Sequence, residues 1–171
     1  LSHCRIVLIS FHSSGPMALS AEMLRIKEIM AEIGISPDHS FGQNFLINRD
    51  LARRIAASVP EKNLDNIIEI GPGLGVLTEE LLKRGGNITC IEKDHLIAST
   101  IFDFLKIPEN GSLEIIEGDA TIILSDILAS RKDFYLVSNL PFNISSHIMG
   151  TILDGYKFSD GAKVPLKGGI I

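Results

Sequence analysis

Short β-type runs alternate with helical stretches through most of the chain after Leu64, and this alternation limits the possible folds most strongly. Runs with the apolar, β-branched character of buried strands cover residues 66–70, 87–91, 113–116 and 134–137. The helical candidates that follow these runs are residues 76–84, 96–105, 121–128 and 145–153. Strand and helix alternating at this spacing predict parallel strands with right-handed crossovers. The expected fold class is therefore α/β, a doubly wound, mainly parallel Rossmann-like sheet.

Two helices are expected before this sheet. The first is predicted by an apolar stripe at alternating spacings of four and three residues, formed by Leu19, Met23, Ile26, Met30 and Ile33. Gly34 is a natural end for this helix. The second helix is expected from about Asn48 to Val59, because an apolar stripe runs along it and Pro60 follows. Both helices are expected to pack on the sheet.

The two ends of the chain differ from its middle. Residues 1–16 hold an apolar run that is too short for a secretory signal and is followed by a polar break. We interpret them as a leader or extension, and we expect a single folded domain to span residues 17–171. After Tyr156 glycines and prolines interrupt the pattern, and residues 162–166 form a poor strand at best. A sheet of four strands has an uncovered edge, so the sheet is expected to be incomplete at its C-terminal end.

Composition narrows the class of protein. A net charge of −5 argues against a surface that holds nucleic acid by charge alone, and Arg49, Arg53 and Arg54 supply only a minor basic footprint. Cys4 and Cys90 are too few for a disulfide scaffold and lack the spacing of a metal site. We therefore expect reduced thiols, no metal and a cytoplasmic location. No apolar run approaches the ~20 residues that span a bilayer, so no membrane contact is expected.

A glycine-rich loop follows the first of the predicted strands. Gly71, Gly73 and Gly75 lie in the segment IEIGPGLG, where glycine permits positive φ and close approach of a ligand to the backbone. Their spacing is G-x-G-x-G, whereas dinucleotide sites carry G-x-G-x-x-G, which speaks against a nicotinamide dehydrogenase. An ordinary turn is the competing interpretation of the loop alone.

Carboxylates at the ends of the next two predicted strands strengthen the signal of the loop. Glu92 lies about 20 residues beyond it, the spacing at which an acid accepts hydrogen bonds from ribose hydroxyls. Asp119 can accept a hydrogen bond from an adenine amine, or it can cap the helix that follows; both roles remain open. Together these residues predict an adenosine-type ligand across the carboxyl edge of the sheet.

The fourth predicted strand ends in the tetrapeptide Asn139-Leu140-Pro141-Phe142. The amine of a base is a poor nucleophile because its lone pair is delocalised into the ring. The side-chain carbonyl of Asn139 and the main-chain carbonyl of Leu140 can accept its hydrogens, which favours a transition state with the lone pair on nitrogen. Pro141 fixes the turn, and Phe142 offers a face for stacking a flipped base. The alternative is a structural turn with a core phenylalanine.

These motifs together resemble the ribosomal RNA adenine N6,N6-dimethyltransferases. The resemblance covers about residues 17–155, and its segments are SFGQNFL at 40–46, EIGPGLGVLT at 69–78, Glu92, GDA at 118–120 and NLPFNIS at 139–145. It implies S-adenosyl-L-methionine as the methyl donor and the N6 amine of adenine in small-subunit ribosomal RNA as the acceptor. A monomer that needs no metal and no covalent nucleophile is expected.

The resemblance also implies roles for individual residues. It assigns cofactor contacts to Asn44, Leu46, Gly71, Gly73, Glu92, Asp119 and Asn139. Gly71 would approach the methionine part of the cofactor, Glu92 its ribose and Asp119 its adenine, while Asn139 would also lie at the target amine. Phe142 stands where many family members carry tyrosine, and either ring can stack.

The end of the sequence departs from the family pattern. Family members continue through further strands and a small helical domain that helps to recognise RNA, so we expect a truncation at the C-terminus. Two alternatives stay open. One is a non-catalytic fragment or ribosome assembly factor that binds cofactor or RNA; the other is a methyltransferase for another planar amine, such as DNA adenine or a protein amide.

Overall fold

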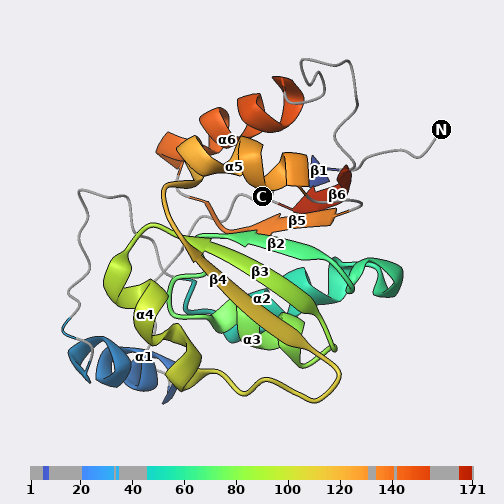
Figure 1. Ribbon diagram of the computed structural model, residues 1–171. Coiled ribbons are helices and arrows are strands. Elements are labelled where there is room, and N and C mark those ends of the chain that lie inside the picture. The colour runs from blue at the N-terminus through green and yellow to red at the C-terminus, as the bar shows by residue number, and fades with distance from the viewer. Residues whose placement is uncertain are drawn as a thin grey trace.

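A computed structural model describes residues 6–7, 21–32, 34, 46–130, 134–140, 142–154 and 166–170. The strands within these residues are β1 (Ile6–Val7), β2 (Ile67–Ile70), β3 (Asn87–Glu92), β4 (Ser112–Glu117), β5 (Phe134–Ser138) and β6 (Leu166–Ile170). In this described part of the chain they form one six-stranded sheet with the order β1-β6-β5-β2-β3-β4 (Figure 1). Every neighbouring pair is parallel.

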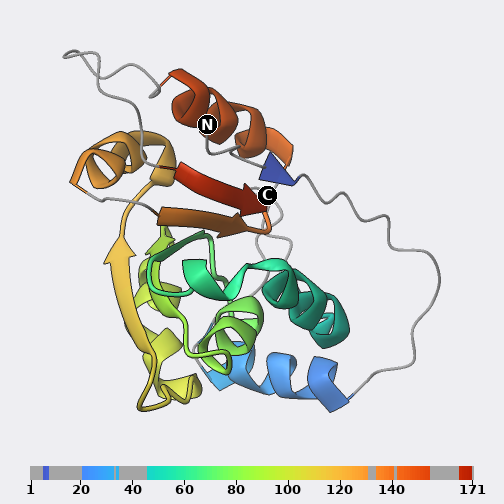
Figure 2. The same cartoon turned by 90° about the vertical axis from the view of Figure 1, so that its right-hand side faces the viewer.

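Helices cover both faces of the sheet. They are α1 (Ala21–Glu32), α2 (Arg49–Ser58), α3 (Val76–Leu82), α4 (His95–Phe104), α5 (Ala120–Ser130) and α6 (Phe142–Asp154), with a short 3₁₀ helix at Glu61–Asn63. Figures 1 and 2 show α5 and α6 together on one side and α1, α2 and α3 on the other. Among the described residues no helix has both the length and the apolar character that crossing a membrane requires.

The alternation of strand side chains divides the core between these two helical layers. Ile67 of β2 and Ile88 of β3 are buried in the cluster that α1, α2 and α3 cover. Ile68 of β2 and Ile91 of β3 point to the opposite face, where α5 and α6 pack on them. All four residues of β2 are buried, as expected for the centre of a parallel sheet with helices on both faces.

The strand order marks the carboxyl edge of the sheet between β2 and β5 as the expected ligand side. The chain builds β2, β3 and β4 in one direction and then returns to the other side of β2 with β5. At such a reversal the connections that leave the two neighbouring strands go to opposite faces, and ligands of doubly wound folds bind in the opening between them. The segments that follow β2 and β5 are the glycine loop and the Asn139 tetrapeptide.

The predicted fold class is confirmed. Each of the four predicted strands and each predicted helix is present, with boundaries that differ by one to three residues. The largest shift within them concerns α6, which begins at Phe142 rather than at residue 145, so Phe142 is the first residue of a helix. Asn143 and Ser145 belong to residue types that favour caps and turns, so the sequence placed the start of this helix after them, whereas the structure includes both in the helix.

The sheet contains two strands, β1 and β6, in addition to the four that we expected. β6 occupies Leu166–Ile170 rather than residues 162–166, and β1 comes from the segment that we interpreted as a leader outside the domain. Gly168 and Gly169 of β6 pair with Tyr135 and Leu136 of β5 through the backbone alone. Because glycine contributes no side-chain alternation, the hydrophobic pattern does not reveal such a strand. Leu19 and Ile33 of the predicted first stripe lie outside the described residues.

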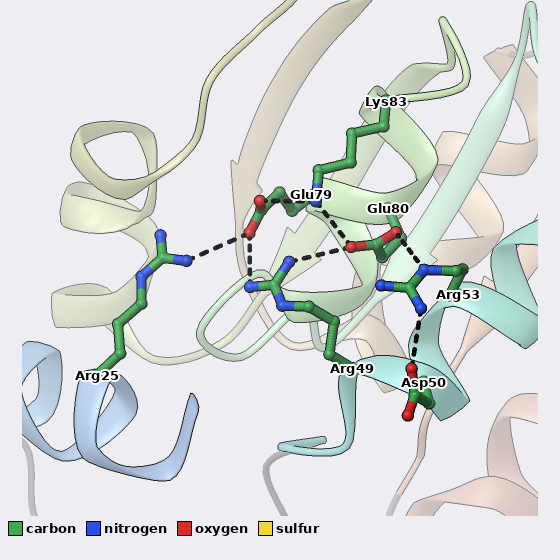
Figure 3. A network of polar contacts seen from close by, with 7 residues as sticks. All are labelled: Arg25, Arg49, Asp50, Arg53, Glu79, Glu80 and Lys83. Atoms are coloured by element: carbon green, nitrogen blue, oxygen red, sulfur yellow. Dashed lines mark hydrogen bonds and ion pairs between the residues drawn. The ribbon is translucent and has the colours of Figure 1, made fainter. Parts of the chain in front are cut away.

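An ion-pair network ties the N-terminal helices to the helix that follows the glycine loop (Figure 3). Arg49 donates to Glu79 at 2.9 Å and to Glu80 at 3.0 Å, and Lys83 lies 2.8 Å from Glu80. Burial acts to raise the pKa of the Glu80 carboxyl, but hydrogen bonds from Lys83 and Arg49 outweigh it and hold that pKa below its ordinary value. The full set is Arg25, Arg49, Asp50, Arg53, Glu79, Glu80 and Lys83.

Arg49→Met is expected to lower the free energy of unfolding by about 1–3 kcal/mol, because two charge-assisted hydrogen bonds are lost. The buried carboxylate of Glu80 then loses one of the cations that neutralise it. Urea denaturation at neutral pH measures this change. Arg54→Met on the exposed side of the same helix is the matched control and should stay within about 0.5 kcal/mol of wild type. Equal losses in both variants would mean that the network adds nothing specific.

Candidate active site

The glycine loop begins directly at the end of β2. Gly71, Gly73 and Gly75 have φ of 65°, 55° and 77°, a left-handed conformation that glycine adopts without strain. The Gly71 N–H donates to the carbonyl of Ile91 at 2.9 Å, which fixes the start of the loop to β3. A Cβ on Gly71 would meet no atom within 4 Å, whereas one on Gly75 would lie 3.0 Å from Leu105. Gly71 therefore leaves its backbone open to a ligand, and Gly75 serves packing.

Glu92 ends β3 beside this loop. One carboxylate oxygen accepts from the Asp94 N–H at 2.9 Å, and the other accepts from the Gly73 N–H at 3.4 Å. The residue is only 7% exposed, and burial raises the pKa of its carboxyl although these N–H groups act against the rise. The Lys93 N–H also acts on this carboxylate, and since a carboxylate has about four acceptor positions, one remains for a hydroxyl donor after these bonds. The carboxylate of Glu92 therefore lies at the loop with limited acceptor capacity for a ligand hydroxyl.

Asp119 follows β4, the next strand of the sheet. One of its oxygens accepts from the N–H of Thr121 at 2.9 Å and from the hydroxyl of Thr121 at 2.6 Å, which is the bonding of a helix cap. The other oxygen lies 2.8 Å from the ammonium of Lys93. Lys93 first, and then Thr121, lower the pKa of Asp119 to about 2. The capping role of Asp119 is thus present. We call the oxygen that contacts Thr121 the inner oxygen and the one that contacts Lys93 the outer oxygen.

Asn139 lies at the same edge of the sheet on the other side of the glycine loop. Ser138 is paired with Ile70 across β5 and β2, so Asn139 comes next to Gly71. The Ser138 hydroxyl donates to the Ile70 carbonyl and holds the two strand ends together. Leu140 is half-buried and packs on the α5–α6 side of the core. The strand order therefore brings Asn139 and the glycine loop together at the carboxyl edge of the sheet.

Other predicted site residues are only partly covered by the structure. Leu46 is half-buried and packs against the core on the α2–α3 side, close in sequence to Asn48, which caps α2. Asn44 and Pro141 lie outside the described residues. Phe142 opens α6. The predicted contacts of these residues with cofactor or base stay predictions.

Glu69 is a buried carboxyl beneath the glycine loop to which the sequence analysis gave no role. It is 1% exposed, and one oxygen accepts from the Thr78 hydroxyl at 2.8 Å and from the Cys90 thiol at 3.7 Å. Burial raises the pKa of Glu69 to about 7. The sequence does carry one sign of this buried carboxyl, because Glu69 is an acidic residue inside an otherwise apolar strand. A charge at such a position is rarely buried without a partner.

The burial of Glu69 should make stability depend on pH. Its folded pKa of about 7 lies above the ordinary 4.5, so the folded protein binds a proton that the unfolded chain releases, and this contribution to stability falls as pH rises from about 4.5 to about 7. Glu69→Gln removes the ionisation and should be more stable than wild type at pH 8, by at most about 3 kcal/mol, with little difference at pH 5.

Urea denaturation at the two pH values tests this dependence. Glu109→Gln, in an exposed loop, is the matched control and should follow the wild-type profile. Parallel pH profiles for Glu69→Gln and wild type would contradict the assigned cause, because the decline would then come from other groups.

The described residues contain no group of three or more His, Cys, Asp or Glu side chains that could hold a metal ion. Cys90 is fully buried, and burial, followed by the charge of Glu69, raises the pKa of its thiol well above the ordinary value. A thiol that stays protonated is a poor nucleophile.

Comparison with known proteins gives a consistent family. The family profile described as "Ribosomal RNA adenine dimethylase" matches residues 36–164. The ribosomal RNA small subunit methyltransferase A of Magnetococcus marinus is 38% identical over 132 residues, which cover 76% of this chain and 47% of the relative. The probable ribosomal RNA small subunit methyltransferase A of Thermococcus sibiricus is 41% identical over 131 residues, which cover 75% of this chain and 44% of the relative.

A solved structure is similar in fold as well. The crystal structure of the 23S rRNA methyltransferase ErmE has a TM-score of 0.55 and 28% identity, over 66% of this chain and 43% of that chain. This chain spans about half the length of the curated relatives that it matches. Since the family profile covers most of the sequence, including every motif at the carboxyl edge, the chain belongs to the ribosomal RNA adenine dimethylase family.

Proposed function

We propose that this chain binds S-adenosyl-L-methionine and transfers its methyl groups to the N6 amine of adenine in small-subunit ribosomal RNA. The observation that carries the proposal is the meeting of four features at one sheet edge. The open glycine loop, Glu92, Asp119 and Asn139 follow four adjacent strands, β2, β3, β4 and β5. The names of the relatives, which are ribosomal RNA methyltransferases, support the same reaction.

The residues at this edge fit the proposed cofactor. The side of Gly71 that faces away from the protein has room for a ligand against the backbone, and Glu92 beside it keeps an acceptor position for a ribose hydroxyl. Asp119 offers a carboxylate oxygen one strand further along. S-adenosyl-L-methionine supplies a methyl group on a positively charged sulfur, which is already activated for displacement. The protein therefore needs to align the two reactants rather than to form a covalent intermediate.

Asn139 and Leu140 would act on the methyl acceptor. Their carbonyl oxygens accept hydrogen bonds from the adenine amine and favour the arrangement in which its lone pair points at the methyl carbon. A stacking face from Phe142 would hold the base outside its helix. The position of Asn139 beside Gly71 supports this assignment, because acceptor and methyl donor must meet within a few ångströms.

The charges of this chain suggest a small contribution to RNA binding. Its net charge is −5, and two of the arginines on α2, Arg49 and Arg53, are engaged with acidic partners. An arginine that already neutralises a carboxylate gives little to a phosphate backbone. We propose that this chain by itself holds RNA only weakly.

The test measures cofactor binding and methyl transfer separately. Titration calorimetry with S-adenosyl-L-methionine should show one site per chain, and labelled methyl groups should then appear on N6 of adenine in small-subunit ribosomal RNA. Binding without transfer to RNA or to small-subunit particles would favour a non-catalytic fragment. Transfer to DNA adenine or to a protein amide in preference to ribosomal RNA would contradict the proposed substrate.

A further inference from the structure

Lys93 and Asp119 form an ion pair at the part of the site where the adenine of the cofactor is proposed to bind. Lys93 directly follows β3, and Asp119 lies just beyond the end of β4, the neighbouring strand. The Lys93 ammonium is 2.8 Å from the outer oxygen of Asp119, while the side chain of Lys93 is 62% exposed and that of Asp119 is 26% exposed. The contact therefore lies at the protein surface, where a ligand can reach it.

The two oxygens of Asp119 have different tasks. The inner oxygen accepts two hydrogen bonds from Thr121, which fix the carboxylate to the start of α5. Releasing it would leave the first turn of that helix without its cap. The outer oxygen, which contacts Lys93, is consequently the acceptor that an incoming amine can use.

We propose that Lys93 competes with the adenine amine of the cofactor for the outer oxygen of Asp119 and thereby lowers the affinity of this site for S-adenosyl-L-methionine. The inference rests on the proposed function, in which Asp119 binds adenine. An ammonium 2.8 Å from that oxygen occupies the position of a hydrogen-bond donor, so an amine that binds in the same direction must displace it. Lys93 thus acts through Asp119 and is a positioning residue rather than a catalytic one.

The competition predicts both a salt dependence and a sign for the effect of Lys93 on affinity, and the sign separates it from other roles. Exposed ion pairs are weakened by added salt because mobile ions screen the two charges. Raising the salt concentration should therefore release Lys93 and reduce its effect on the cofactor. A lysine that instead stacked on the adenine or contacted the carboxylate of the cofactor would increase affinity, and its replacement would weaken binding.

Calorimetric titration with S-adenosylhomocysteine tests the proposal on the full chain. Lys93→Gln should bind about two- to fivefold more tightly than wild type at low salt, the effect expected for removing one exposed ion pair. This gain should shrink at 0.5 M salt. Lys93→Arg keeps the charge and should bind no more tightly than wild type. Lys62→Gln removes one exposed charge before β2, at the opposite edge of the sheet, and should also match wild type.

A second ligand shows whether the effect passes through Asp119. S-inosylhomocysteine carries an oxygen at the position of the adenine amine, so this position accepts a hydrogen bond instead of donating one to Asp119, and Lys93→Gln should not improve its binding. In the free protein, Lys93→Gln should also raise the pKa of Asp119, which carbon NMR of the carboxyl measures directly, because Lys93 is the largest cause of its low value.

The outcomes separate this inference from the proposed function. Equal or weaker binding of S-adenosylhomocysteine by Lys93→Gln overturns the inference, and so does an equal gain for S-inosylhomocysteine, while cofactor binding by wild type still supports the function. Failure of wild type and every variant to bind either ligand overturns both.

Discussion

Asn139→Ala is expected to slow methyl transfer to ribosomal RNA by about 10²–10³-fold, by analogy with the loss of one aligned acceptor or donor at a reacting centre. Affinity for S-adenosyl-L-methionine should stay near the wild-type value, because the altered side chain acts mainly on the methyl acceptor. The two quantities are measured by single-turnover transfer of labelled methyl groups and by calorimetry. A large loss of rate with little loss of binding is the signature of a group that acts in the transition state.

Asn110→Ala provides the matched control for this variant. Asn110 is exposed in the loop that precedes β4, at the amino edge of the sheet and away from the glycine loop. Its replacement should leave the transfer rate unchanged. If Asn139→Ala methylated RNA at the wild-type rate, the tetrapeptide would be a structural turn, and the acceptor amine would have to be oriented by other groups.

Glu92→Ala is expected to weaken cofactor binding by at least about tenfold, because each hydrogen bond from a hydroxyl to a carboxylate contributes about 1.5–3 kcal/mol. The loss includes a second effect, since Glu92 also accepts from the N–H groups of Gly73 and Asp94 and so holds the glycine loop. Glu92→Gln keeps one carbonyl acceptor and should fall between wild type and Glu92→Ala. Calorimetry with S-adenosylhomocysteine measures all three proteins.

The control for Glu92→Ala is the acid at the corresponding position of the next strand. Glu117 is paired with Glu92 in the register of β4 and β3, but its side chain is exposed and contacts His95. Glu117→Ala should therefore change cofactor affinity little. Unchanged affinity in Glu92→Ala itself would contradict the ribose assignment and leave Glu92 as a structural residue of the loop.

The sequence was sufficient for the parts of the fold that depend on local patterns. β2, β3, β4 and β5 are apolar runs of high β-propensity, and the switch from their rhythm to a helical one marks each crossover. The glycine loop and the acids at the strand ends were found because their spacing reflects the geometry of a parallel sheet. That Asn139 lies beside Gly71 came from the strand order of the structure, because the sequence alone does not say which strand ends are neighbours.

The remaining features depend on contacts between residues that are distant in sequence. Arg49 meets Glu80 across 31 positions, and neither residue carries a local sign of that partner. Lys93 and Asp119 likewise come together only through the pairing of β3 with β4. The burial of Glu69 depends on what covers the strand, and β6 is held by backbone pairing that includes two glycines. In each case the sequence supplied the residue and the tertiary structure supplied its role.

The position of β2 has a consequence for how this domain moves. The strand is hydrogen-bonded to β3 on one edge and to β5 on the other, and it is buried on both faces. Local opening of such a strand requires separation of its neighbours, so we expect its amide protons to exchange with solvent more slowly than those at the edge of the sheet. The glycine loop is thus anchored to a strand that resists local opening, and we expect adjustment to a ligand to fall to side chains at the rim, of which Lys93 is one.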